Sequence, residues 1–266
     1  EPIEPGPLRV REPHPRGGVT LVVDKTVARL TLARPERHNS LEADDVAGFL
    51  GHLDAIEDDP TIRVLVLTAT GDDTFCAGAA LHQMESGEMS GLIFDGLTGR
   101  LAGIGVPTVC VLNGSVYGGG AELALCCDFR IGADDIRLSV PAARLGVCYP
   151  VGGLTRYVER LGLATANRIL LAAEELDARE MERVGYLTHR VPRQDLNEEA
   201  NLLVTRLASL APLAVQAMKR ILLDVAGGRL DTEAAARAID VCATSADLKE
   251  GLAAQRERRP PAFEGR

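Results

Sequence analysis

The chain has 266 residues, of which 46% are hydrophobic and 25% are charged, a composition typical of soluble globular proteins. Its 38 acidic residues outnumber the 29 basic ones, which gives a net charge of −9. Binding a nucleic-acid backbone requires clustered Lys and Arg, and stacking on bases requires aromatic side chains, which are only 3% of this chain. We therefore expect no nucleic-acid partner.

The sequence also argues against a membrane or metal-binding protein. The longest charge-free stretch, residues 101–121, is long enough to cross a bilayer, but it contains six glycines, Pro107 and Asn113 and is therefore interpreted as a strand with turns. No secretory signal is visible, and no pair of the six cysteines has the spacing of metal ligands. We expect reduced thiols, no metal, no membrane contact and a cytoplasmic location.

The first two thirds of the chain alternate between strand and helix patterns. Residues 1–17, with five prolines, are expected to form an extended arm. The expected strands cover residues 19–23, 27–33, 62–68, 108–112 and 129–133. The expected helices run from Ser40 to about residue 57, over 92–104 and over 118–127. This order predicts an α/β fold built of strand-strand-helix units over residues 18–194.

Helical periodicity dominates the remainder of the chain. Asp177 and Glu180 form a plausible capping pair at the start of one helix. Further helices are expected over residues 196–210, 213–225, 232–244 and after 247. The last three have apolar faces with little chain left to cover them. We therefore expect residues 195–266 to form a helical layer that packs on the core and on another subunit.

Two glycine-containing turns are candidates for the functional site. Gly118, Gly119 and Gly120 separate an apolar strand from an apolar helix whose one charge is Glu122, so backbone N–H groups and a carboxylate could share a cavity. A tight turn with a glutamate that compensates the helix dipole explains the same residues. The second turn, residues 75–81 (FCAGAAL), has four small residues in a row and could equally be a packing corner. Together, the turns favour a pair of N–H donors aimed at one oxygen, as in an oxyanion hole.

Five segments, in the same order, resemble the enoyl-CoA hydratase/isomerase (crotonase) superfamily, and the resemblance covers residues 18–265. They are residues 34–41 (RPERHNSL), 75–81 (FCAGAAL), 113–123 (NGSVYGGGAEL), 150–156 (PVGGLTR) and 259–263 (RPPAF). The resemblance implies a crotonase-like spiral core with a helical C-terminal layer that assembles a homotrimer or hexamer. It also implies an acyl-CoA substrate, with coenzyme A as part of that substrate and no tightly bound cofactor.

The resemblance assigns roles to particular residues. The N–H groups of Ala79 and Gly119 would hold the thioester oxygen and stabilise an enolate, and Glu122 would transfer the proton. The residues expected at the substrate or its coenzyme A part are Arg34, Arg37, His38, Ala77, Ala80, Leu81 and His82.

The chain departs from the family pattern at three positions, one of which is His82 at the basic position that follows the FCAGAAL turn. Ala80 occupies a position where the family usually has Asp, and Ala142 follows Pro141 where hydratases have their second glutamate. Hydration benefits from an acid/base group at each carbon, so a single carboxylate suits isomerisation or another lyase step at least as well. A catalytically silent protein that binds CoA esters is the alternative from a different class. Tyr149, Cys148, Arg144, His82, Glu85 and Tyr117 are expected near the cavity, but none is singled out as a replacement acid.

Overall fold

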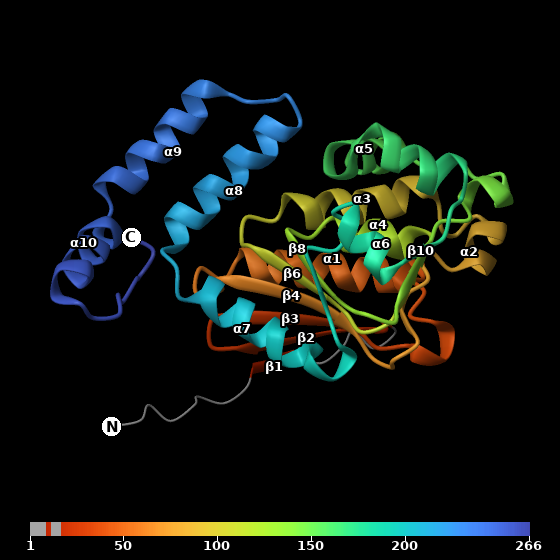
Figure 1. Ribbon diagram of the computed structural model, residues 1–266, viewed down its shortest axis with the longest axis horizontal. Helices are drawn as coiled ribbons and strands as arrows, with labels where there is room; N and C mark the ends of the chain where they lie inside the picture. The colour runs from red at the N-terminus through yellow and green to blue at the C-terminus, as the bar shows by residue number, and fades with distance from the viewer. Residues whose placement is uncertain (1–8, 12–16) are drawn as a thin grey trace.

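Two β-sheets with helices packed around them form the core of the computed structural model, which describes residues 9–11 and 17–266 (Figure 1). The larger sheet has the order β1-β2-β3-β4-β6-β8-β11, and the smaller has the order β10-β9-β7-β5. The strands are β1 (Arg9–Arg11), β2 (Val19–Asp24), β3 (Val27–Leu32), β4 (Val64–Ala69), β5 (Thr74–Cys76), β6 (Thr108–Leu112), β7 (Ser115–Tyr117), β8 (Phe129–Ala133), β9 (Arg137–Ser139), β10 (Leu176–Asp177) and β11 (His189–Val191). The expected arm over residues 1–17 lies largely outside the described residues.

The helices cover both the core and the C-terminal end of the chain. They are α1 (Ala43–Glu57), α2 (Leu81–Ser86), α3 (Gly91–Gly103), α4 (Gly119–Leu125), α5 (Val151–Ala166), α6 (Ala178–Arg183), α7 (Leu196–Ala208), α8 (Pro212–Ala226), α9 (Thr232–Thr244) and α10 (Ala246–Glu257). Short 3₁₀ turns cover Pro35–Arg37, Ala142–Leu145 and Arg193–Asp195, and a π-helical turn covers Asn167–Leu171.

The predicted strand-strand-helix units are confirmed. Strands β4, β6 and β8 lie side by side and parallel in the larger sheet, and each is followed by a short strand of the smaller sheet, β5, β7 or β9. A helix comes next in every unit. Because β5, β7 and β9 are also parallel neighbours, the turns that leave their carboxyl ends meet at one edge of the small sheet.

The predicted helix start at Ser40 is wrong. Helix α1 begins at Ala43, and Glu42 caps it through a reciprocal pair of hydrogen bonds with Asp45. The residue between, Leu41, instead forms an isolated parallel bridge with Ala79, and its amide donates to the carbonyl of Gly78 at 2.8 Å. That bridge keeps the segment extended, so the helix starts three residues later than the sequence suggests.

Helices α8, α9 and α10 extend away from the two sheets (Figure 1). Lys219 attaches α8 to the core, because its ammonium group donates to the carbonyl of Val106 at 2.8 Å and lies 2.8 Å from the carboxylate of Asp128.

Over the described residues, no single helix is long and apolar enough to cross a bilayer. Only one pair of helices, Arg193–Ala208 and Pro212–Ala226, meets that criterion together, on length and composition alone, and the two are bent by 105°.

Candidate active site

The two glycine turns of the sequence lie in direct backbone contact. Gly78, with φ of +84°, is so close to the second turn that a Cβ at this position would lie 2.5 Å from the amide nitrogen of Gly119. A Cβ on Gly120 would lie 2.1 Å from the carbonyl oxygen of Cys76. Real Cβ atoms do not approach backbone atoms this closely, so both positions require glycine. Residues distant in the sequence thus form one continuous backbone surface.

The amides of Ala79 and Gly119 are available for a ligand. Leu41 accepts a hydrogen bond from the Ala80 amide at 2.9 Å and donates to the Gly78 carbonyl, so the N–H of Ala79 between them points to the opposite side. Gly119 is the first residue of α4, where an N–H group has no acceptor within the helix. Both residues line the same cavity.

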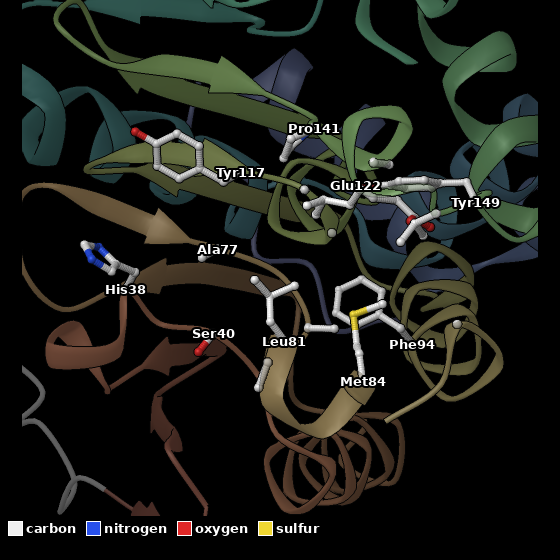
Figure 2. A pocket seen from close by; sticks show the side chains of 18 of the residues that line it. His38, Ser40, Ala77, Leu81, Met84, Phe94, Tyr117, Glu122, Pro141 and Tyr149 are labelled. Atoms are coloured by element: carbon white, nitrogen blue, oxygen red, sulfur yellow. The ribbon is translucent and has the colours of Figure 1, made fainter. Parts of the chain in front are cut away.

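That cavity has a volume of about 710 Å³ and lies between α2, α3, α4 and the segment 141–150. Figure 2 shows Met84, Phe94 and Tyr149 around its inner end, beside Glu122, and His38 and Tyr117 farther out. The side chains at the inner end are mostly apolar, so this part can take an apolar group. The outer part is more polar.

Most of the predicted site residues line this cavity. They are Arg37, His38, Ala77, Ala79, Ala80, Leu81, His82, Gly119 and Glu122. Arg34 does not line it, and its guanidinium lies 3.0 Å from Glu42 and 3.3 Å from Asp45. Arg37 pairs with Glu42 too, and His82 lies 3.6 Å from it. The hydrogen bond from Arg34 is the main influence that lowers the pKa of Glu42. This carboxylate lies close to three basic side chains near the cavity mouth, those of Arg34, Arg37 and His82.

Glu122 lies at the buried end of the cavity, with its side chain 3% exposed. Its Oε1 is 2.5 Å from Nη1 of Arg156 on α5. Burial raises the pKa of the carboxyl group above its ordinary value, and the positive charge of Arg156 opposes that rise. The neighbouring hydroxyl of Thr98 also lowers the pKa, whereas the charge of Asp95 raises it. A buried carboxyl group whose pKa is raised in this way can both accept and donate a proton, as an acid/base group must.

Ala142 lines the cavity together with Pro141, as the sequence resemblance implies. Among the described residues that line the cavity, Glu122 is the one carboxylate. Of the further side chains considered from the sequence, His82, Tyr117 and Tyr149 line the cavity, but Cys148, Arg144 and Glu85 do not. Burial raises the pKa of Tyr149, so its hydroxyl stays protonated.

Sequence reasoning missed the residues that surround the carboxylate of Glu122. Arg156 belongs to the PVGGLTR segment that carries part of the resemblance, but nothing in the spacing connects it with Glu122, 34 positions earlier. Asp95 and Thr98 lie one turn apart on α3 and look like ordinary helix residues in the sequence. Their role depends on how α3 and α5 pack on α4, which has no local sequence signal.

Metal ligation has no candidate among residues 9–11 and 17–266, where no three His, Cys, Asp or Glu side chains are grouped to hold an ion. The six cysteines are free thiols, four of them buried. Burial raises the pKa of Cys76 to about 12, so this thiol beside the glycine turns is protonated at neutral pH.

Comparison with known proteins agrees with this geometry. The family model described as enoyl-CoA hydratase/isomerase matches residues 23–266. The chain belongs to the enoyl-CoA hydratase/isomerase family. It is 30% identical over 254 residues to the crotonyl-CoA hydratase of Syntrophomonas wolfei, covering 92% of this chain and 97% of that protein. It is also 30% identical over 251 residues to the 2,3-dehydroadipyl-CoA hydratase of Escherichia coli, covering 90% and 96%.

Solved structures of this family share the whole fold. The enoyl-CoA hydratase from Mycobacterium tuberculosis H37Rv superposes with a TM-score of 0.85 at 29% identity and covers 96% of this chain and 100% of that one. An enoyl-CoA hydratase from Bacillus anthracis gives a TM-score of 0.86 at 26% identity, with 94% and 100% covered. The resemblance read from the five motifs, and the crotonase fold that it implied, are therefore confirmed. The chain is an enzyme of the crotonase family.

Proposed function

We propose that this enzyme binds an acyl-CoA thioester and moves a proton at the carbon next to the thioester carbonyl, with Glu122 as its single acid/base. The observation that carries the proposal is the convergence of three groups in one cavity: the amides of Ala79 and Gly119, and the carboxyl group of Glu122. The two amides bind the thioester oxygen. When a proton leaves the substrate, the resulting enolate places negative charge on that oxygen, where two N–H donors stabilise it.

The coenzyme A part of the substrate lies toward the cavity mouth in this proposal. Arg37 supplies positive charge there, and Arg37, His38 and His82 supply hydrogen-bonding groups, which suits phosphate groups. Arg34 acts through Glu42 in this arrangement, since the carboxylate lies between Arg34 and Arg37. The apolar inner end of the cavity takes the acyl chain. The assigned ligand is a substrate, so no tightly bound cofactor is invoked.

Double-bond isomerisation is the reaction that best fits a single carboxylate. Glu122 removes the proton on the α-carbon of a 3-enoyl thioester, the electron pair forms a dienolate on the thioester oxygen, and Glu122 then delivers a proton to the γ-carbon. The product is the 2-enoyl thioester, and no water or second acid is consumed. Ala142 at the cavity wall supports this choice, because it provides no carboxyl group opposite Glu122.

Hydration is the second candidate, and the names of the relatives favour it. In that reaction water adds its oxygen to the β-carbon, Glu122 accepts the water proton, and Glu122 then passes a proton to the α-carbon of the enolate. The relatives over most of this chain include a crotonyl-CoA hydratase and a 2,3-dehydroadipyl-CoA hydratase.

Both reactions share the α-proton transfer, which gives a test that does not depend on the choice between them. Saturated, 2-enoyl and 3-enoyl CoA esters are incubated with the enzyme in D₂O, and deuterium in the acyl group is measured by mass spectrometry. We expect exchange at the α-carbon, with conversion of the 3-enoyl to the 2-enoyl ester, and no exchange with Glu122→Gln. Binding of the esters without exchange or turnover contradicts the proposal and identifies a silent CoA-ester binder.

We also infer that the enzyme is a homotrimer or hexamer. Helices α8, α9 and α10 extend from the core and carry large apolar side chains that are more than half exposed in the single chain. They include Met218, Leu222, Val225, Ile239, Val241 and Leu252. Large apolar side chains exposed repeatedly along three helices in this way indicate an interface. Light scattering that gives a 28.3 kDa particle at micromolar concentration contradicts the inference.

A further inference from the structure

The Glu122–Arg156 ion pair forms the wall between two cavities. Glu122 lines the cavity described above, whereas Arg156 lines a second cavity of about 410 Å³ beside α3, α5 and α8. The two side chains are 3% and 12% exposed, so the pair is largely shielded from solvent. An ion pair with so little water around it acts strongly on the ionisation of each partner.

Two glycines allow α5 to lie directly on the carboxylates beneath it. A Cβ on Gly153 would lie 2.9 Å from Oε2 of Glu122, and a Cβ on Gly152 would lie 2.3 Å from Oδ1 of Asp95. The first turn of α5 therefore covers one carboxylate from α4 and one from α3. Arg156 is one turn farther along α5, and its guanidinium pairs with Glu122 rather than Asp95.

The other groups around Glu122 do not supply positive charge. Asp95 on α3 raises its pKa, and the Thr98 hydroxyl on the same helix lowers it without a charge of its own. At the C-terminal cap of α4, the Cys126 thiol is neutral, because burial raises its pKa. Burial raises the pKa of Tyr149 and of Tyr157 as well, so both phenols are neutral where they approach Glu122. Of the charged side chains that act most on Glu122, Arg156 is the positive one.

We propose that Arg156 is a positioning residue that holds Glu122 in its ionised form and fixes its carboxylate through Oε1. The naming of Glu122 as the substrate base rests on the proposed function above, but the ionisation of Glu122 does not. In a site with a single carboxylate, the resting state must be the carboxylate if the first step removes a proton. Arg156 supplies that condition against the burial of Glu122 and the charge of Asp95.

The experiment measures the ionisation of Glu122 directly, without turnover. Infrared difference spectra between the wild type and Glu122→Gln identify the carboxyl band of Glu122, which is then titrated with pH in each variant. In Arg156→Gln we expect the midpoint to rise by at least about one pH unit, since an opposite charge at this separation typically lowers a carboxyl pKa by about 1–3 units. Arg156→Lys keeps the charge and should restore most of the wild-type midpoint.

Two further variants separate the charge effect from a packing effect. Arg160→Gln removes a charge from the same helix one turn later, outside the ion pair with Glu122, and should leave the midpoint nearly unchanged. Asp95→Asn removes the repulsive neighbour and should lower the midpoint. If Arg156→Gln does not fold, Arg156→Lys takes its place as the folded variant. The fall in the midpoint expected from the wild type to Asp95→Asn then still tests whether neighbouring charges set the ionisation of Glu122.

The outcomes distinguish this inference from the proposed function. An unchanged midpoint in folded Arg156→Gln, or an upward shift in Asp95→Asn, overturns the role of Arg156. If the midpoint shifts as expected but the pH dependence of kcat/KM does not follow it, Arg156 controls Glu122 but Glu122 is not the base. In that case the proposed function fails and the inference stands.

Discussion

Replacing Glu122 by Gln tests the assignment of the acid/base, because the substitution removes the proton-transfer group and preserves the size of the side chain. A positioned acid/base group is typically worth about 100- to 10,000-fold in rate, so we expect kcat/KM to fall by that factor. The amides of Ala79 and Gly119 are unchanged, and binding of a CoA ester should therefore change little.

The same substitution has a cost in stability that can be estimated from the ion pair. Removing one partner of a fully buried ion pair costs about 3–5 kcal/mol, since the remaining charge is left without compensation. Here the Arg156 side chain retains 12% exposure toward the second cavity, and the amide oxygen of the substituted side chain can still accept its hydrogen bond. We therefore expect a smaller loss of about 1–2 kcal/mol, or roughly 2–8 °C in Tm for a chain of this size.

The assay combines initial rates on the best CoA ester, calorimetric binding of an unreactive CoA thioester, and thermal unfolding. A fall in rate accompanied by an equal fall in binding indicates a damaged site rather than a lost acid/base group. Full activity in a folded Glu122→Gln protein refutes the assigned role, since no other carboxylate lines the described part of the cavity.

Further predictions concern the missing carboxylate, the glycine contact and the pH dependence. Ala142→Glu should raise hydration of a short 2-enoyl-CoA by at least about tenfold in initial rate, equal to ~1.4 kcal/mol, and a folded variant with no gain means that the cavity is not arranged for hydration. Gly120→Ala forces a Cβ to within 2.1 Å of the Cys76 carbonyl oxygen, so it should lower the free energy of unfolding by about 1–3 kcal/mol or more and abolish turnover. Gly96→Ala is the control, because a Cβ at that position meets nothing within 4 Å and should cost neither stability nor turnover. Equal thermal unfolding of the two variants contradicts the packing argument. The pKa of Glu122 is raised and its carboxylate is the active form, so kcat/KM should increase with pH through a midpoint above the ordinary value for Glu; a rate that falls over that range means that the protonated form is active.

Several elements could be predicted from the sequence because their signals are local. The strands at β2, β3, β6 and β8 and the helices from α7 to α10 follow from runs of apolar residues with clear periods and flanking turns. Strands β5, β7, β9 and β10 have only two or three residues each, too few for a period to be recognised, so the second sheet had no signal of its own.

The residues of the candidate site could likewise be predicted only where they lie close together in the sequence. Gly118, Gly119, Gly120 and Glu122 are nearly contiguous, so the sequence indicated them as one unit. That Gly78 touches Gly119 depends on the parallel pairing of β5 with β7, which no local pattern specifies. The predicted boundary of α1 was wrong for a related reason, since a long-range bridge to Leu41 overrode local capping preferences.

The site with a single carboxylate places a constraint on the surroundings of that group. When two acids share a reaction, one can be protonated while the other is ionised, and their pKa values can differ. Glu122 must both accept and return the proton, so its pKa has to lie between the extremes that burial alone and an ion pair alone would give. Burial and Asp95 shift the pKa upward, and Arg156 and Thr98 shift it downward. Asp95 and Thr98 act from α3 and Arg156 acts from α5, and α5 approaches Asp95 at Gly152 and Glu122 at Gly153, where a side chain would not fit.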